Sequence, residues 1–289
     1  MTEPSIGNRI CAIGLRSLLG AILALAPVCL QAGNPESLIP REQHPWGHFA
    51  KGSWKRVRTT TETFDEMGRV TAVTVTETKT SLVDVTGSGV TLQVDVAVEV
   101  AGKKFASAPQ VIKQGFGGEQ EGQPVVVRKV GDGTVEIEGQ KIPAEVRQMV
   151  LQGNGTRRIR TIHYCAEVAP HILREVYEGG DSEGKVKSYE TEVEVVALEM
   201  PLRHDNQLIS ASLRKVTHKA ATGAVTTTLE QYSEEVPGGV VGNTLKEVDA
   251  DGRMTRRSTL ELVDFQVVEQ TSDVRAARPR LFSRLRERK

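Results

Sequence analysis

The sequence predicts a mainly β protein, a large antiparallel meander that forms an incurved sheet or half-barrel and is built from repeated four-stranded units. The first observation behind this prediction is the segment Val90–Val100, in which valine or leucine occupies every second position. Such alternation is typical of a strand with one buried and one solvated face. At ~3.3 Å per residue this strand is about 36 Å long, which favours a large curved sheet over a small sandwich.

The second observation is an internal repeat, in which Gln140–Leu198 returns in diverged form as Gln207–Gln266. Tyr164-Cys-Ala-Glu-Val168 corresponds to Tyr232-Ser-Glu-Glu-Val236 at a distance of 68 residues. A fixed long period is the signature of a duplicated supersecondary unit. We expect the strands of the first copy near 144–152, 156–166, 171–178 and 185–198, and those of the second near 211–219, 224–234, 240–248 and 253–268.

The third observation is a recurring turn, with aspartate first and glycine fourth, that begins at Asp65, Asp181 and Asp249. This spacing suits a type I turn closed by a residue in the left-handed conformation, which glycine adopts without steric cost. The first of these turns lies between the predicted strands Trp54–Phe64 and Val70–Val83. We therefore infer a third, partial copy of the hairpin near the start of the folded region.

Residues 1–32 have the pattern of an export signal, with two arginines before the uncharged apolar run Leu18–Leu30 and a small residue at Ala32. The run is short for a membrane span. We expect cleavage near Ala32, with an uncleaved anchor as the alternative. Cleavage would leave Cys165 as the single cysteine, so we expect no internal disulfide.

We divide the rest of the chain into an extended segment at 33–50, an N-terminal β region with a partial repeat at 51–138, tandem four-stranded β repeats at 139–268, and a basic C-terminal tail at 269–289. From Arg275 to Lys289 the tail has seven basic residues and one acidic residue. A solvated tail is the simplest interpretation. The alternative is a short helix that lies on an anionic membrane surface.

Composition excludes some partners. Of the 37 basic and 37 acidic residues, the signal segment holds two and one, so the remainder is nearly neutral. This balance argues against a nucleic-acid partner. Aromatic residues make up 4% of the chain, so the core must consist mostly of valine, leucine and isoleucine, and a surface for stacking sugars is not indicated.

The N-terminal β region contains several expected turns. Gly87–Gly89 and Ala101–Lys103 flank the long alternating strand, and Gly131–Gly133 is predicted as a tight turn between strands at 124–130 and 134–138. The glycine-rich stretch Gly115–Gly122 is the strongest candidate for a mobile loop. A phosphate-binding loop is disfavoured because no lysine followed by serine or threonine comes after these glycines.

The sequence has no Gly-x-Ser-x-Gly elbow, zinc-protease helix or dinucleotide-binding fingerprint. We therefore assign no catalytic, cofactor-binding or metal-binding residues, expect no cofactor, and favour a non-catalytic protein over an enzyme. The densest set of metal-ligand residue types is His163, Cys165 and His171, which a strand and the following turn would bring near one another. Metal binding stays open there, since no fourth ligand or recognisable spacing accompanies them.

Two weaker metal candidates have simpler explanations. His44 and His48 are four residues apart, but the proline and glycine between them break the helix that would align the two rings. Glu247–Gly252 resembles the start of a calcium loop, although Ser258 occupies the position where such a loop has a bidentate glutamate.

A resemblance adds to this interpretation. The stretch Tyr232–Val241, which leaves one predicted strand and enters the next, resembles a segment of exported bacterial β proteins of unassigned function. The long meander is similar in architecture to the incurved half-barrel of LolA/LppX-type lipoprotein and lipid carriers. That resemblance implies export to the periplasm, cell envelope or extracellular space, and a lipid or lipoprotein acyl chain held in the concave face.

The sequence thus favours an exported, non-catalytic envelope protein whose curved sheet binds or carries a hydrophobic ligand. The alternative is a structural or adaptor protein of the envelope that has no small-molecule ligand. A hydrolase with a dispersed site is the third hypothesis.

Overall fold

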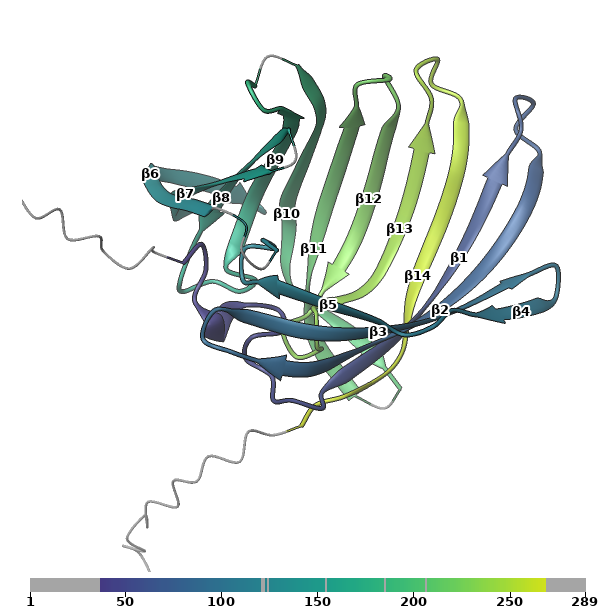
Figure 1. Ribbon diagram of the computed structural model, residues 1–289, viewed down its shortest axis with the longest axis horizontal. Coiled ribbons are helices and arrows are strands. Elements are labelled where there is room, and N and C mark those ends of the chain that lie inside the picture. The colour runs from purple at the N-terminus through teal and green to yellow at the C-terminus, as the bar shows by residue number, and fades with distance from the viewer. Residues whose placement is uncertain are drawn as a thin grey trace, which may run out of the picture. The chain divides into compact units, whose positions relative to one another are not determined.

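The computed structural model describes residues 37–268, apart from 121–122, 124, 154, 185 and 206. This part contains 14 strands in one antiparallel sheet, which is not closed into a barrel, together with the 3-10 helix η1 (Arg41–Gln43) (Figure 1). The predicted fold class, a large antiparallel meander in an incurved sheet, is confirmed. No helix in the described residues is long and apolar enough to cross a membrane. The predicted signal and basic tail lie outside the described residues.

The observed strands match those predicted for the two copies to within a few residues at most ends. In chain order they are β1 (Trp54–Phe64), β2 (Val70–Val85), β3 (Gly89–Val100), β4 (Lys103–Ala106), β5 (Gln110–Gly115), β6 (Val125–Ile137), β7 (Gln140–Gly153), β8 (Thr156–Tyr164), β9 (Ile172–Asp181), β10 (Lys187–His204), β11 (Gln207–Ala220), β12 (Val225–Tyr232), β13 (Val240–Val248) and β14 (Met254–Gln266).

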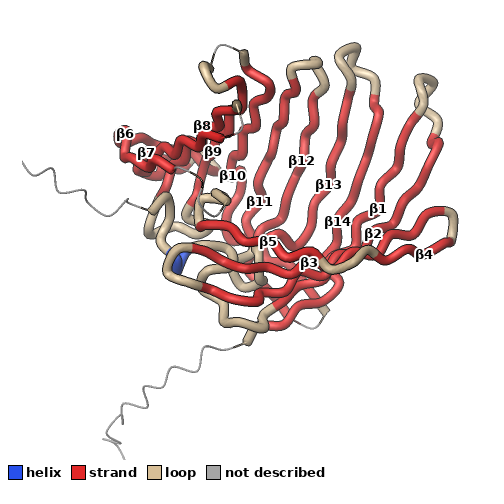
Figure 2. The backbone as a smooth tube through the Cα atoms, in the orientation of Figure 1, coloured by secondary structure: helices blue, strands red, loops and turns tan. Residues whose placement is uncertain are grey.

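The sheet order is β4-β3-β2-β1-β14-β13-β12-β11-β10-β9-β8-β7-β6, and β5 also pairs with β3. The first and last strands are therefore neighbours, with Trp54 opposite Gln266. The two ends of the sheet consist of strands β3–β5 and β6–β9, and both ends curl toward the same side (Figure 2). Strand twist and the β-bulges in many of the pairs favour this curvature.

The pairing register divides the side chains between two faces, because residues directly opposite in an antiparallel pair point to the same side. We call the face that contacts the N-terminal segment the inner face. Leu82 and Leu92 are paired across β2 and β3 and belong to this face, since both pack in one cluster with Trp46 and Phe49. The residues that alternate with them form the outer face.

The N-terminal segment, residues 37–53, covers the base of the curved sheet. Leu38 and Ile39 pack against buried residues of β7 and β8, while Trp46 and Phe49 pack against β2 and β3. An extended conformation was expected here. The structure instead shows η1 and a series of turns, because the four apolar side chains anchor the segment to both halves of the sheet.

Two loops at the base have the same geometry at an offset of 68 residues. The N–H of Cys165 donates to the carbonyl of His171, and the N–H of Ser233 donates to the carbonyl of Gly239, both at 2.8 Å. His171 and Gly239 both have positive φ angles, 62° and 74°. The strand before each loop also carries a bulge at the equivalent place.

The predicted hairpin turns are equivalent as well. Gly68, Gly184 and Gly252 have φ angles of 74°, 73° and 81°, as the left-handed position requires. Each N–H donates to the carbonyl of the aspartate three residues earlier, at 3.0, 3.1 and 3.0 Å. The turn geometry is what a duplicated unit would give, and a common origin of the two copies stays a prediction.

The N-terminal β region differs from the prediction in one place. The tight turn expected at Gly131–Gly133 is wrong, because β6 runs through these residues and pairs with β7 along its whole length, with a register shift between Lys129 and Gly131. A bulge therefore accounts for the glycines. The actual turn is at Glu138 and Gly139, both of which have positive φ angles.

The glycine-rich stretch after β5 contains a buried side chain. Phe116 is 6% exposed and packs with Trp46 and Phe49, so this part of the stretch is tied to the base. Whether the remainder is mobile stays a prediction.

The turn glycines give the first test. Replacing Gly68 or Gly252 by alanine should lower the free energy of unfolding by about 1–2 kcal/mol, because both have open space for a methyl group but a left-handed backbone. Denaturant melts measure this difference. Gly87→Ala is the matched control, since its backbone is not left-handed and it also has open space. An equal cost at Gly87 would contradict the conformational explanation.

Candidate functional site

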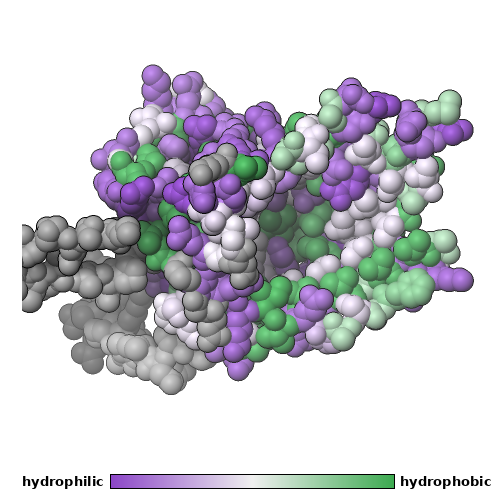
Figure 3. Space-filling model, turned by 45° about the horizontal axis from the view of Figure 1, so that its top comes forward, coloured by the Kyte–Doolittle hydropathy of each residue, from purple (hydrophilic) through white to green (hydrophobic). Residues whose placement is uncertain are grey.

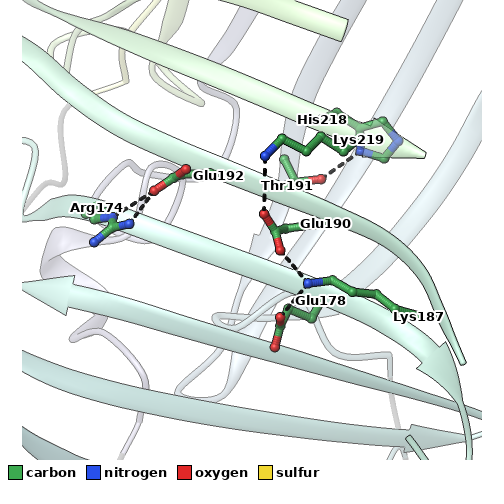
Figure 4. A network of polar contacts seen from close by, with 8 residues as sticks. All are labelled: Arg174, Glu178, Lys187, Glu190, Thr191, Glu192, His218 and Lys219. Carbon is green, nitrogen blue, oxygen red and sulfur yellow. Dashed lines mark hydrogen bonds and ion pairs between the residues drawn. The ribbon is translucent and has the colours of Figure 1, made fainter. Parts of the chain in front are cut away.

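Charged side chains on the outer face form ion pairs across neighbouring strands. Figure 4 shows one such network, in which Lys187 lies 2.7 Å from Glu178 and also contacts Glu190, while Lys219 lies 3.9 Å from Glu190. Further pairs along the sheet include Arg58–Glu77, Arg257–Glu62 and Arg174–Glu192. Such partly exposed pairs add little stability individually. Their charged side chains do make the outer face hydrophilic.

The inner face has a different composition. By register, β1, β2, β3 and β10 to β14 turn mostly threonine, valine and leucine inward. These side chains include Val57, Thr59, Thr61, Thr76, Thr78, Thr80, Val94, Val96, Val98, Thr191, Val193, Val216, Thr228, Leu245, Leu260 and Leu262. Figure 3 shows a hollow lined by hydrophobic and intermediate residues, with hydrophilic residues gathered at the strand tips.

A cavity of about 540 Å³ lies where the inner face meets the N-terminal segment. Ile39, His44 and Pro45 of that segment line it together with Gly238 of a base loop. Its walls come from β7 to β12. The wall residues include Met149, Leu151, Arg158, Arg160, Glu175, Tyr177, Tyr189, Thr191, Val193, Arg214, Val216, Glu230 and Tyr232.

Two buried ion pairs lie in this cavity wall, each between two strands. Arg160 binds Glu175 through Nε and donates from Nη1 to the carbonyl of Gly117 at 3.0 Å. Arg214 donates from Nε to Glu230 Oε1 at 2.9 Å. The arginine side chains are only 14% and 19% exposed. Burial removes hydration that pairing only partly replaces, so stability alone gives no reason for these charges.

Arginine also stacks on tyrosine at equivalent positions of the two copies. The guanidinium carbon of Arg214 is 4.0 Å from the ring centroid of Tyr232, and that of Arg147 is 4.0 Å from the ring of Tyr164. Only the first pair lines the cavity. The same stacking in both copies indicates that it belongs to the scaffold, while the Arg214–Glu230 pair belongs to the cavity.

Burial shifts the protonation of several groups at the base. It raises the pKa values of Tyr177 and Tyr232, so both phenols remain protonated donors. Burial, with a smaller contribution from Arg160, lowers the pKa of His44 to about 4. Lys55, which its pairing with Thr80 places on the inner face, is also buried, and burial lowers its pKa to about 8 against the opposing charge of Glu230.

His44 has a structural role that fits its neutral state. Its Nδ1 accepts hydrogen bonds from the backbone N–H groups of Trp46 and Gly47, at 3.2 and 3.1 Å. A protonated Nδ1 could not accept them. The histidine thus holds the turn that closes the cavity.

The sequence-predicted metal candidates do not come together. Among the described residues, no group of three or more His, Cys, Asp or Glu side chains could hold a metal ion. The Nδ1 atom of His171 contacts the carbonyl of Cys165 at 3.1 Å, and Nδ1 of His163 has no hydrogen-bond partner within the described part of the chain. In the calcium-like stretch, Asp249 Oδ1 accepts from the N–H of Arg253 at 2.9 Å, so this carboxylate closes its own turn.

Comparison with known proteins gives no family assignment. No protein-family model and no curated protein matches the chain. Among solved structures, a "putative lipoprotein" from Parabacteroides distasonis is similar over 75% of this chain and 96% of its own, with 11% sequence identity and a TM-score of 0.32. A likeness at this score assigns neither family nor function.

No cavity residue was assigned from the sequence, although the chain contains a signal. Arg160 is in phase with the buried Ile162 and Tyr164 of β8, and Glu230 is in phase with Tyr232 of β12. A charge that shares its period with buried side chains must point into the protein. The base loops that close the cavity had no comparable signal.

The histidine gives the second test. In the unfolded chain a histidine takes up a proton near pH 6.5, whereas His44 in the folded protein does so only near pH 4. The unfolded state therefore binds more protons between these values, so the free energy of unfolding should fall by up to about 3 kcal/mol from pH 7 to pH 4.

Chemical denaturation at a series of pH values measures this fall. His44→Asn is the comparison, because the amide oxygen can accept the same two backbone hydrogen bonds but does not titrate. In the variant, the free energy of unfolding should fall less steeply between pH 7 and pH 4, because the contribution of His44 is absent. Identical slopes in the two proteins would contradict this assignment.

Proposed function

We propose that the protein is an exported, non-catalytic envelope protein whose curved sheet binds a ligand with a hydrophobic part, such as an acyl chain. The observation that carries this proposal is the separation of side chains between the two faces. Ion pairs make the outer face hydrophilic, while the inner face is a largely uncharged surface of threonine, valine and leucine. Among the described residues only the N-terminal segment covers it, at its base. Uncovered apolar surfaces of this extent are typical of binding sites.

The shape of this surface favours a small or chain-like ligand over a folded protein. The N-terminal segment closes the base, and the cavity there has a volume of about 540 Å³. Small-molecule sites are usually of this size and have mostly apolar walls with a few placed polar groups. Export rests on the signal pattern in residues 1–32 and is part of the same proposal.

A pair of variants tests the binding surface. Val96 points inward and is paired with Thr78, while its neighbour Ala97 points outward and is paired with Glu77. Val96→Lys should reduce uptake of a fluorescent fatty acid at least tenfold, because it places a charge in the apolar wall. Ala97→Lys should bind as the unchanged protein does.

Titration of the fluorescent probe into purified protein measures uptake, and thermal melts show that both variants are folded. Native mass spectrometry of protein prepared without detergent provides a second readout, in which co-purified lipid supports the proposal. An unchanged protein that neither takes up the probe nor carries lipid would instead favour the structural or adaptor role.

A further inference from the structure

We propose that the base cavity binds the anionic head group of an amphiphile whose chain lies along the inner face. This inference rests on the proposed function and names the class of ligand. It is carried by three observations, which are the charge balance of the cavity lining, its unused hydrogen-bond donors, and its continuity with the apolar wall.

The lining carries an excess of positive charge. Three arginines, Arg158, Arg160 and Arg214, face two glutamates, Glu175 and Glu230. Each glutamate is paired with one arginine. Among the described residues, no carboxylate forms an ion pair with Arg158, which is itself an exposed residue. Glu119 lies outside the lining but interacts with the charge of Arg160 and offsets one cation, so the positive excess depends on Arg158 together with the nearby Lys55. This excess suits an anion.

The ammonium group of Lys55, which the pairing register also places on the inner face, adds to this potential. Its Nζ donates to the carbonyl of Val240 at 3.0 Å, and both Arg214 and Glu230 interact with its charge. His44 adds no positive charge at neutral pH, since its Nδ1 is occupied by backbone donors. A carboxylate or phosphate group in the cavity would therefore meet a positive potential.

The lining also has hydrogen-bond donors that have no acceptor among the described residues. Arg214 uses Nε and Nη2 for Glu230, and no acceptor in the described part of the chain takes a hydrogen bond from its Nη1. Arg160 similarly uses Nε and Nη1 and leaves Nη2. The hydroxyl of Tyr232 has no hydrogen-bond partner within these ranges either. Guanidinium groups and phenols with free donors bind carboxylate and phosphate oxygens well.

The donor-rich end continues directly into the uncharged wall. Thr191, Val193 and Val216 line the cavity and also belong to the inner face described above. A ligand whose acidic group lies at Arg160 and Arg214 can therefore extend its chain past these residues toward the strand tips. An apolar chain with an anionic end satisfies both halves of the site.

Four 12-carbon probes with different head groups test the charge preference. Dodecanoate and dodecyl phosphate are anionic, dodecanol is neutral, and dodecyltrimethylammonium is cationic. Below their micellar concentrations, isothermal titration calorimetry should give dissociation constants at least tenfold lower for the better anion than for dodecanol, with the cation binding most weakly. The comparison of the two anions tells a fatty-acid carboxylate from a phosphate-bearing lipid.

Two variants localise the preference. Arg158→Gln should weaken binding of the preferred anion at least threefold and leave dodecanol unchanged. Arg157→Gln is the matched control, because Arg157 is the adjacent residue of β8 and lies away from this cavity. The double variant with Arg214→Gln and Glu230→Gln removes the guanidinium donors together with their paired carboxylate and leaves the net charge of the lining unchanged. It should weaken binding of the preferred anion at least threefold, because Arg214 no longer donates to the head group.

The outcomes separate the two proposals. Equal binding of anionic and neutral probes, or a preference for the cation, would overturn the head-group assignment and leave the proposed function standing. An affinity for the anion that is unchanged in both variants would also overturn it. If none of the four probes binds the unchanged protein, both proposals fail.

Discussion

The pairing of β1 with β14 is the contact on which the rest of the structure depends. It joins the first and the last described strand within the sheet, from Trp54–Gln266 at the base to Thr63–Arg256 near the turns. The meander β6–β14 and the strands β1–β5 thereby become one curved surface. The N-terminal segment enters β1 at the base, where it can reach both curled ends.

The second constraint is that the inner face must accommodate both the N-terminal segment and the cavity. Aromatic side chains of the N-terminal segment fill the space near β2 and β3, and smaller apolar ones contact β7 and β8. Between these anchors lie the two buried ion pairs of Arg160 and Arg214. The N-terminal segment thus shields from water charges that a less covered sheet would leave hydrated, and charges in such a place interact more strongly with one another.

The strands could be predicted because period-two alternation and glycine turns are local properties of the chain. Val90–Val100 and the turn at Gly252 show this, since each needs only its neighbours to be recognised. The strand order could not be predicted in the same way, because pairing of Thr61 with Ser258 joins residues 197 positions apart. The cavity depends on that order, so its residues were not assigned even though Arg160 and Glu230 fall in phase with buried neighbours.

The same long-range pairing has a consequence for how the chain folds. The strands β6–β14 can add to one another in succession, since each pairs with its neighbour in sequence. Strand β1 is made early, yet its partner β14 is among the last described residues to be made, and an unpaired strand edge can recruit other chains. Closing so long a loop is also entropically costly and slow. The early hairpins must therefore be kept from wrong partners until β14 arrives. Only then do the parts of the inner face on β1–β3 and on β10–β14 become one surface.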